Sequence, residues 1–180
     1  MKFKLIYLKI KRHIRGGVPS ISELRLKGAK IGENCHIYGT IDHGHEFLVT
    51  IGNNVTLASS CNLLTHDGST KKILGFSKVG RIDIGDNVFI GAGSIILPNV
   101  KIGNNVIVGA GSVITRDIPD DSIVVGNPGV RIGSYVDFVK KNKEFMKTKP
   151  IYKTDCFNKT SEEKELMKKE LKISGIGFDL

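Results

Sequence analysis

A six-residue repeat dominates this sequence. An aliphatic residue returns at every sixth position from Ile84 to Ile114, and a second small or apolar residue follows each of them by four positions. The two series are Ile84, Ile90, Ile96, Ile102, Val108 and Ile114, and Val88, Ser94, Val100, Val106, Ser112 and Ile118. A period of six matches neither the α-helix nor the alternation of a long strand. The repeat therefore predicts a solenoid of very short strands, whose core forms only when successive coils stack.

The repeat begins at Ile31 and pauses twice, at an irregular stretch (residues 42–47) and at a polar segment (residues 67–80). Segments such as Gly85-Asp-Asn recur within it. Because glycine and asparagine tolerate positive φ, these segments predict sharp corners of the chain. The expected organisation is a basic amphipathic helix at 1–17, a coil domain at 18–132 with an inserted loop at 67–80, and a helical extension at 133–180.

The helical extension is expected from two further patterns. Tyr135, Phe138 and Val139 are spaced for one face of a helix. Thr160 and Glu163 have the spacing of a capping box, which predicts a second helix that runs through Lys172.

Charge is concentrated at the N-terminus. The net charge is +9, and the first fifteen residues hold six basic residues and no acidic one. This helix could cover the open first coil or lie on an anionic membrane surface, and both roles stay open. Lysines interrupt its apolar residues, which argues against a signal peptide or a membrane span. We therefore expect a cytoplasmic protein. If the helix binds lipid, the protein would lie at the inner face of the membrane. No nucleic-acid-binding motif accompanies the charge.

The three cysteines, Cys35, Cys61 and Cys156, form neither a disulfide framework nor a metal-type spacing. Cys35 and Cys61 fall on the small inward position of the repeat. We expect both to fill the core as reduced thiols.

The run from Ile84 to Pro119, the Gly126-Asn-Pro that follows it and the segment Leu64-Thr-His-Asp-Gly-Ser69 resemble the hexapeptide-repeat acyltransferases. The likeness spans Ile31 to Ile132 and is greatest to the maltose and galactoside acetyltransferase branch, in particular to sugar O-acetyltransferases of capsule and lipopolysaccharide assembly. It implies an all-β, left-handed parallel β-helix. It also implies a homotrimer with active sites between neighbouring prisms, acetyl-CoA as acyl donor and a sugar or saccharide as acceptor.

Acetyl transfer to an alcohol requires a base, and free histidine, with a pKa of roughly 6.5, suits that task. Of the five histidines, His66 lies at a coil corner, where its side chain projects outward, and the resemblance places the catalytic histidine there. We expect His66 to act as general base in a direct transfer. The alternative is an ordinary loop histidine.

Other site residues follow from the resemblance. Asp42, together with Asn62 and Asp67, is expected to bind the acceptor. The residue that orients His66 stays open. Asp67 is adjacent to His66, but neighbouring side chains in extended backbone point to opposite sides. For acetyl-CoA, Ala92 and Ala110 are expected along the pantetheine arm, and Thr115 and Arg116 at the nucleotide end. Arg131 is a further phosphate candidate, although the family usually places its cation one position earlier.

A metal is not expected, since His43 and His45 form a His-x-His pair without a third ligand close by in the sequence. The same argument disfavours a γ-class carbonic anhydrase, which needs three converging histidines. Two alternatives remain: a xenobiotic acetyltransferase, and a non-catalytic β-helix scaffold in which His66→Ala would change nothing and acetyl-CoA would not bind.

Overall fold

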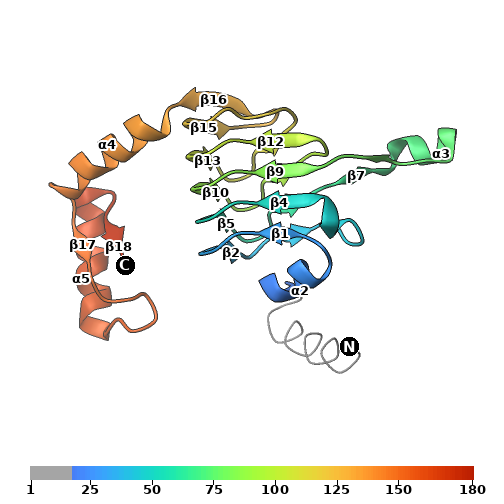
Figure 1. Cartoon of the computed structure of the whole chain (residues 1–180). Coiled ribbons are helices and arrows are strands. Elements are labelled where there is room, and N and C mark those ends of the chain that lie inside the picture. Colours follow the sequence, from blue (N-terminus) through green and yellow to red (C-terminus); the bar gives the residue numbers. More distant parts are fainter. Residues whose placement is uncertain (1–17) are drawn as a thin grey trace, which may run out of the picture. The chain divides into compact units, whose positions relative to one another are not determined.

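The computed structural model describes residues 18–180 and divides into two units, one ending at Tyr135 and the other formed by Val136–Leu180 (Figure 1). The basic helix expected at residues 1–17 lies outside the described residues. Each unit is described by itself.

The first unit is a three-sided coil of parallel strands (Figure 1). Its first side is formed by β1 (Lys30–Ile31), β4 (Val49–Ile51), β9 (Ile82–Ile84) and β12 (Val100–Ile102). Its second side is formed by β2 (His36–Ile37), β5 (Thr56–Leu57), β10 (Val88–Ile90), β13 (Val106–Val108) and β15 (Ser122–Val125). Its third side is formed by β3 (Thr40–Ile41), β6 (Asn62–Leu63), β11 (Ile95–Ile96) and β14 (Val113–Ile114).

Strand register explains the six-residue period. Val88 pairs with Val106, and Ile96 pairs with Ile114, so one coil corresponds to three hexapeptides. Successive hexapeptides therefore occupy successive sides of the triangle. The coil ends where β16 (Val130–Gly133) turns back and pairs antiparallel with β15.

The interior of the coil is filled by the two series of the repeat. All twelve of their members are buried, and none is more than 5% exposed. Cys61 is also fully buried, and Cys35 is half-buried against the same core, which agrees with the expected packing role. Burial of these aliphatic side chains, which happens only on stacking, supplies the main driving force for the fold.

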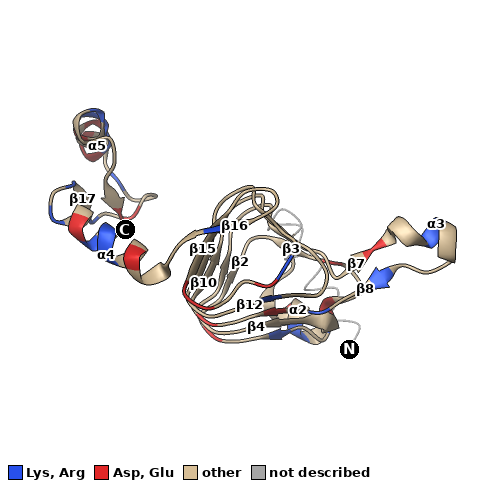
Figure 2. Cartoon of the chain, turned by 90° about the horizontal axis from the view of Figure 1, so that it is seen from above, with Lys and Arg blue, Asp and Glu red and all other residues tan. Residues whose placement is uncertain are grey.

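The corners between the first and second sides carry a ladder of polar side chains. Positive φ angles of 53° to 56° recur there at Asn34, Asn54, Asn87, Asn105 and Asp121. The side-chain amide of Asn54 donates to that of Asn87, and Asn87 donates to Asn105, both at 3.1 Å. In the row beside them, the Asp86 carboxylate accepts from the N–H of Asn53 at 2.6 Å. Acidic residues gather along this corner (Figure 2). The expected asparagine corners are confirmed.

Three segments depart from the coil, and the sequence indicated only the positions of two. Helix α2 (Ile21–Leu26) precedes the first strand and contributes the buried Leu24 to the core. The first interruption contains the 3-10 helix η1 (Glu46–Leu48). The second was expected as a polar loop, but it is an antiparallel hairpin. It consists of β7 (His66–Asp67), η2 (Gly68–Thr70), α3 (Lys71–Leu74) and β8 (Lys78–Val79).

The second unit contains α4 (Tyr135–Met146), which begins at the boundary, then β17 (Ile151–Tyr152), α5 (Ser161–Ser174) and β18 (Phe178–Asp179). The capping box at the start of α5 is present, since Thr160 and Glu163 bond reciprocally. The short parallel pair β17–β18 was not expected. In residues 18–180, every helix is too short or too polar to span a bilayer.

Candidate active site

His66 lies where the chain leaves the third side of the coil. Thr65 before it is fully buried, and the side chain of His66 is 42% exposed because neighbouring side chains in extended backbone point in opposite directions. Strand β7 begins at His66, so the hairpin holds the backbone of this residue at the surface of the coil. The imidazole is therefore accessible to a substrate.

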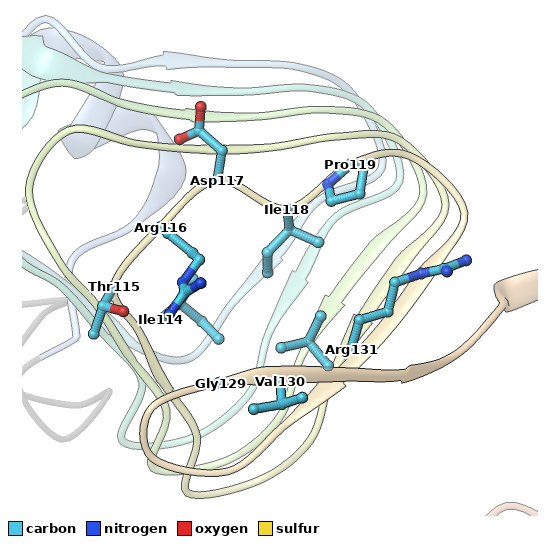
Figure 3. Close-up of a pocket in the computed structure, with 10 residues that line it drawn as sticks. Ile114, Thr115, Arg116, Asp117, Ile118, Pro119, Gly129, Val130 and Arg131 are labelled. Carbon is cyan, nitrogen blue, oxygen red and sulfur yellow. The ribbon is translucent and has the colours of Figure 1, made fainter.

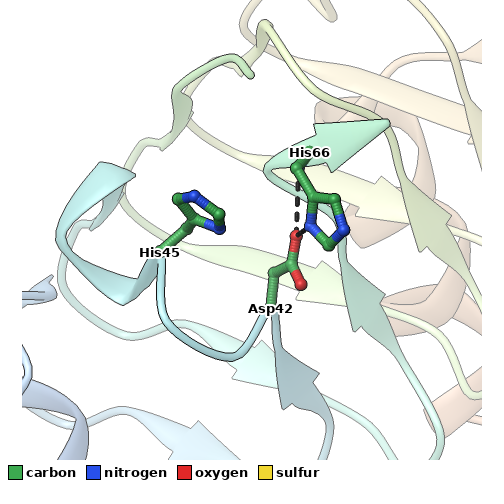
Figure 4. A group of neighbouring side chains, drawn as sticks. All are labelled: Asp42, His45 and His66. Carbon is green, nitrogen blue, oxygen red and sulfur yellow. Dashed lines mark hydrogen bonds and ion pairs between the residues drawn. The ribbon is translucent and has the colours of Figure 1, made fainter. Parts of the chain in front are cut away.

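Asp42 approaches His66 from the preceding coil. It follows β3, whose Ile41 pairs with Leu63 of β6, and this stacking places the carboxylate below the start of the hairpin (Figure 4). One oxygen, Oδ2, accepts hydrogen bonds from the N–H groups of Thr65 and His66, both at 3.0 Å, and from the hydroxyl of Thr65 at 3.2 Å. The same oxygen contacts Nδ1 of His66 (Figure 4). The imidazole is thus bonded to a carboxylate that is itself held by the backbone.

The environment keeps this carboxylate ionised. Burial of the side chain, which is 10% exposed, opposes ionisation, but the hydrogen bonds from His66 and from the backbone of Thr65 outweigh it and hold the pKa of Asp42 below its ordinary value. An ionised Asp42 favours the tautomer of His66 that carries its proton on Nδ1. The lone pair of Nε2 is then available as a base.

The partner that orients His66, left open by the sequence, is therefore Asp42. The interpretation of Asp42 as an acceptor ligand did not include this contact. Asp67 instead organises the hairpin turn: its carboxylate accepts from the N–H and the hydroxyl of Ser69 at 2.8 and 3.0 Å. These bonds lower the pKa of Asp67.

A cavity of about 300 Å³ opens beside Asp42 and is lined by residues of three neighbouring segments. Asn62 contributes to its wall, and its side-chain oxygen accepts from the hydroxyl of Thr40 at 2.5 Å. A buried carboxylate, Glu46, pairs there with Lys27 at 2.9 Å. The structure thus brings the expected residues Asp42 and Asn62 to one cavity, and Asp42 in its wall also contacts His66.

His45 was missed as a neighbour of this site. Its ring centroid lies 5.5 Å from that of His66, and its buried Nδ1 atom has no hydrogen-bond partner among the described residues. Asp42, His45 and His66 each offer one ligand atom, and the three atoms lie within 4.8 Å of one another (Figure 4). The only sequence signal was the interruption of the repeat at residues 42–47, one coil before His66.

Three of the expected cofactor residues meet at a second cavity of about 250 Å³ (Figure 3). Thr115, Arg116 and Arg131 line it, and this cavity shares no lining residue with the first. The guanidinium of Arg131 donates to the hydroxyl of Ser122 at 3.0 Å and to the carbonyl of Asp121 at 3.1 Å. In Figure 3 it points away from Arg116. Arg116 is exposed, so of the two arginines it is the one better placed to contact an anionic ligand in this cavity.

The two alanines of the expected pantetheine track occupy equivalent turns of neighbouring coils. Both are exposed, and the N–H of Gly111, next to Ala110, donates to the carbonyl of Ala92 at 2.8 Å. A methyl side chain leaves the backbone of such a turn open to a ligand. Ala92 and Ala110 thus form a continuous, unobstructed edge of the coil.

Comparison with known proteins bears on this geometry. Residues 81–116 match the family model described as bacterial transferase hexapeptide (six repeats). Protein CapG of Staphylococcus aureus is 42% identical over 156 residues, which cover 80% of this chain and 87% of CapG. The chain belongs to the hexapeptide-repeat transferase family. The resemblance inferred from the sequence is confirmed, and the coil is a left-handed parallel β-helix, as that resemblance implied.

Solved structures of hexapeptide-repeat transferases support the same assignment. A hexapeptide-repeat-containing acetyltransferase from Vibrio cholerae O1 biovar eltor, complexed with acetyl coenzyme A, is 28% identical with a TM-score of 0.55, and the match covers 61% of either chain. A maltose O-acetyltransferase from Clostridium difficile 630 is 28% identical with a TM-score of 0.55, over 71% of this chain and 84% of that one.

Serine acetyltransferases are also relatives of this transferase. The protein from Staphylococcus aureus strain Mu50 is 41% identical over 121 residues, or 61% of this chain. The match spans 52% of that protein, so the chain covers about half of its length.

Proposed function

We propose that this protein is an acetyl-CoA-dependent O-acetyltransferase that acetylates a sugar hydroxyl in surface polysaccharide biosynthesis. The observation that carries the proposal is the Asp42–His66 pair, whose Asp42 lines a cavity, in a chain of the hexapeptide-repeat transferase family. The acetyl-CoA complex of the Vibrio cholerae relative supports the donor. The maltose O-acetyltransferase of Clostridium difficile supports a sugar as acceptor.

The proposed reaction is a direct transfer. Nε2 of His66 takes the proton of the acceptor hydroxyl as its oxygen attacks the thioester carbonyl carbon. The new C–O bond replaces the C–S bond, and the proton passes from His66 to the departing CoA sulfur. Asp42 holds the ring through Nδ1 and stabilises the imidazolium that forms between the two proton transfers. Much of the rate gain comes from holding both substrates in register.

The cavity beside Asp42 has mixed walls, and its polar side chains suit a hydroxyl-rich acceptor. Thr40 and Asn62 offer a hydroxyl and an amide, and Lys27 and Glu46 offer opposite charges. Such groups bond to sugar hydroxyls both as donors and as acceptors. We assign the acceptor to this cavity, and we do not assign Asp67 as a direct ligand, because it does not line the cavity and bonds to Ser69.

The donor is assigned to the edge of the coil that carries Ala92 and Ala110 and to the cavity at Arg116. A guanidinium binds phosphate oxygens with strong charge-assisted hydrogen bonds, which suits the nucleotide end of acetyl-CoA. Thr115 adds a hydroxyl beside it. The two cavities share no residue, and this separation fits the proposal that a homotrimer completes each site at the cleft between neighbouring subunits.

The decisive experiment measures release of CoA from acetyl-CoA against a panel of free sugars and nucleotide sugars, with wild-type protein, His66→Ala and His36→Ala. His36 is an exposed histidine on β2, outside both cavities. We expect His66→Ala to lose about 10²- to 10⁴-fold in turnover while His36→Ala retains it. Undiminished transfer by His66→Ala would remove this residue from the mechanism.

Serine is a second candidate acceptor, favoured by the relatedness to serine acetyltransferases. It also presents a hydroxyl to a base, so the panel includes serine, and a xenobiotic with a free hydroxyl. A rate with serine above that of every sugar would change the assignment of the acceptor and leave the roles of His66 and Asp42 intact.

A further inference from the structure

The side chain of His45 has no task in the acetyl transfer described above. It is half-buried, its ring faces Asp42 and His66 (Figure 4), and its Nδ1 atom is buried without a hydrogen-bond partner among residues 18–180. A buried polar atom of this kind costs free energy unless something bonds to it. The neighbouring His43, in contrast, is exposed.

We propose that Asp42, His45 and His66 form a binding site for Zn²⁺, and that the bound ion prevents His66 from acting as a base. Two imidazoles and one carboxylate are a common donor set for zinc, with nitrogen and oxygen atoms at about 2.0–2.2 Å from the ion. The three ligand atoms already lie within 4.8 Å of one another. Small side-chain rotations therefore suffice to close them around an ion.

The site is open on one side, as a three-ligand zinc site requires. The side chain of His66 is 42% exposed, which leaves room for water as the fourth ligand and a path for the ion. The sequence did not indicate this site, because no third ligand lies close to His43 and His45 along the chain. Asp42 and His45 share one loop, and the remaining ligand, His66, comes from the coil that stacks on that loop.

The loop that carries His45 is held by a second layer of contacts. Glu46 is buried, and its carboxylate accepts from the N–H of Gly44 at 2.9 Å and from Lys27 at 2.9 Å. The N–H of Leu48 donates to the carbonyl of His45 at 2.9 Å and starts the turn of η1. Ligands held by such second-layer bonds lose little freedom on binding a metal, which favours affinity.

Inhibition follows from the chemistry of the ligands, and this part of the inference rests on the proposed function. A metal binds the lone pair of a neutral imidazole, so a ring that holds Zn²⁺ has no lone pair to take the acceptor proton. The ion also competes for the carboxylate of Asp42. Zn²⁺ should therefore lower transfer reversibly, and a chelator should restore it.

Binding is tested on the full chain by titration with Co²⁺, whose visible absorption reports tetrahedral coordination, and by displacement with Zn²⁺. The variants are His45→Gln, Asp42→Asn and the control His36→Gln, each checked for a cooperative melting transition well above the assay temperature. The near-ultraviolet band of cobalt–thiolate bonds separates any binding to the exposed Cys156. Mutation of a residue that only supports a ligand typically weakens metal binding by about 10- to 100-fold. His45→Gln and Asp42→Asn each remove a direct ligand and should weaken Co²⁺ binding by more than that.

Inhibition is tested by the transfer of radiolabelled acetyl groups, because Zn²⁺ binds the thiol that a CoA-release assay detects. Zn²⁺ should inhibit wild type and His36→Gln at the concentration that saturates the cobalt site, and His45→Gln should require at least about 10-fold more. Equal cobalt binding or equal zinc inhibition in wild type and His45→Gln would overturn the proposal. If no acceptor is acetylated at all, the proposed function fails, and the Co²⁺ titration alone still decides whether the site exists.

Discussion

Asp42 and His66 are joined twice, since the same carboxylate oxygen accepts from the backbone N–H of His66 at 3.0 Å and contacts its imidazole Nδ1. The two residues are 24 positions apart in the chain. Their proximity arises because β3 and β6 stack in adjacent coils. One carboxylate therefore fixes both the position of the backbone and the orientation of the ring.

Replacement of Asp42 by asparagine should lower turnover while it preserves the coil. The amide cannot stabilise the imidazolium, and it leaves His66 free to adopt the other tautomer. We expect the turnover number for acetyl transfer to fall by at least about 10-fold, with a smaller change in the KM for acetyl-CoA. The matched control is Asp83→Asn, a carboxylate on β9 that pairs with Arg81 on the surface. Equal activity of the two variants would contradict the positioning role of Asp42.

The lowered pKa of Asp42 predicts how stability responds to acid. A carboxyl whose pKa is lower in the folded state contributes its stabilisation in full above its ordinary pKa of about 3.9. That contribution is lost as pH falls through the folded value. The difference in unfolding free energy between wild type and Asp42→Asn should therefore be constant from pH 7 to about pH 5 and shrink below about pH 4. Urea unfolding at several pH values measures it. A difference that grows in acid would show the opposite shift.

Arg116 and Arg131 should differ in their effect on the donor. Arg116 is exposed in the second cavity, so Arg116→Ala should raise the KM for acetyl-CoA by about 10-fold with little change in kcat, as expected for a lost hydrogen bond to a charged group. Arg131 bonds to Ser122 and to Asp121, so Arg131→Ala should mainly lower the melting temperature. Arg81→Ala is the control, because Arg81 pairs with Asp83 and does not line the second cavity. A larger KM effect from Arg131 than from Arg116 would reverse these roles.

Ile96 tests whether the repeat supplies the stability of the coil. It is fully buried in β11, and Ile96→Ala should lower the free energy of unfolding by about 2–5 kcal/mol through lost burial and the cavity left behind. Ile132→Ala, at a residue that is 64% exposed, is the matched control and should cost far less. Denaturant unfolding of both variants gives the comparison. Similar losses at the two positions would mean that burial in the coil is not what stabilises it.

Several features could be derived from the sequence because they are local and periodic. A hexapeptide repeats its pattern of inward and outward side chains regardless of which coil it joins, so Ile84 and Val88 already indicated the core. The asparagine corners follow for the same reason, since positive φ is a property of single residues. Thr160 and Glu163 indicated a helix start through bonds that span three positions.

The interruptions of the repeat were harder to interpret. The segment at 67–80 has no period and predicts only a polar loop, whereas in the structure His66 pairs with Val79 in a hairpin. Its exposed apolar residues, such as Ile73 and Phe76, do not follow the burial pattern of a hairpin packed on a core. Local patterns carry no information on such pairings.

The sequence alone determined the coil and its inward residues and predicted His66 as the base, because each depends on a spacing of a few positions or on a motif. Only the tertiary structure decided that Asp42 orients His66 and that His45 joins them. The physical reason is the insertion at residues 42–47, which breaks the regular count between coils, so the contacts across it depend on how the backbone stacks after the break.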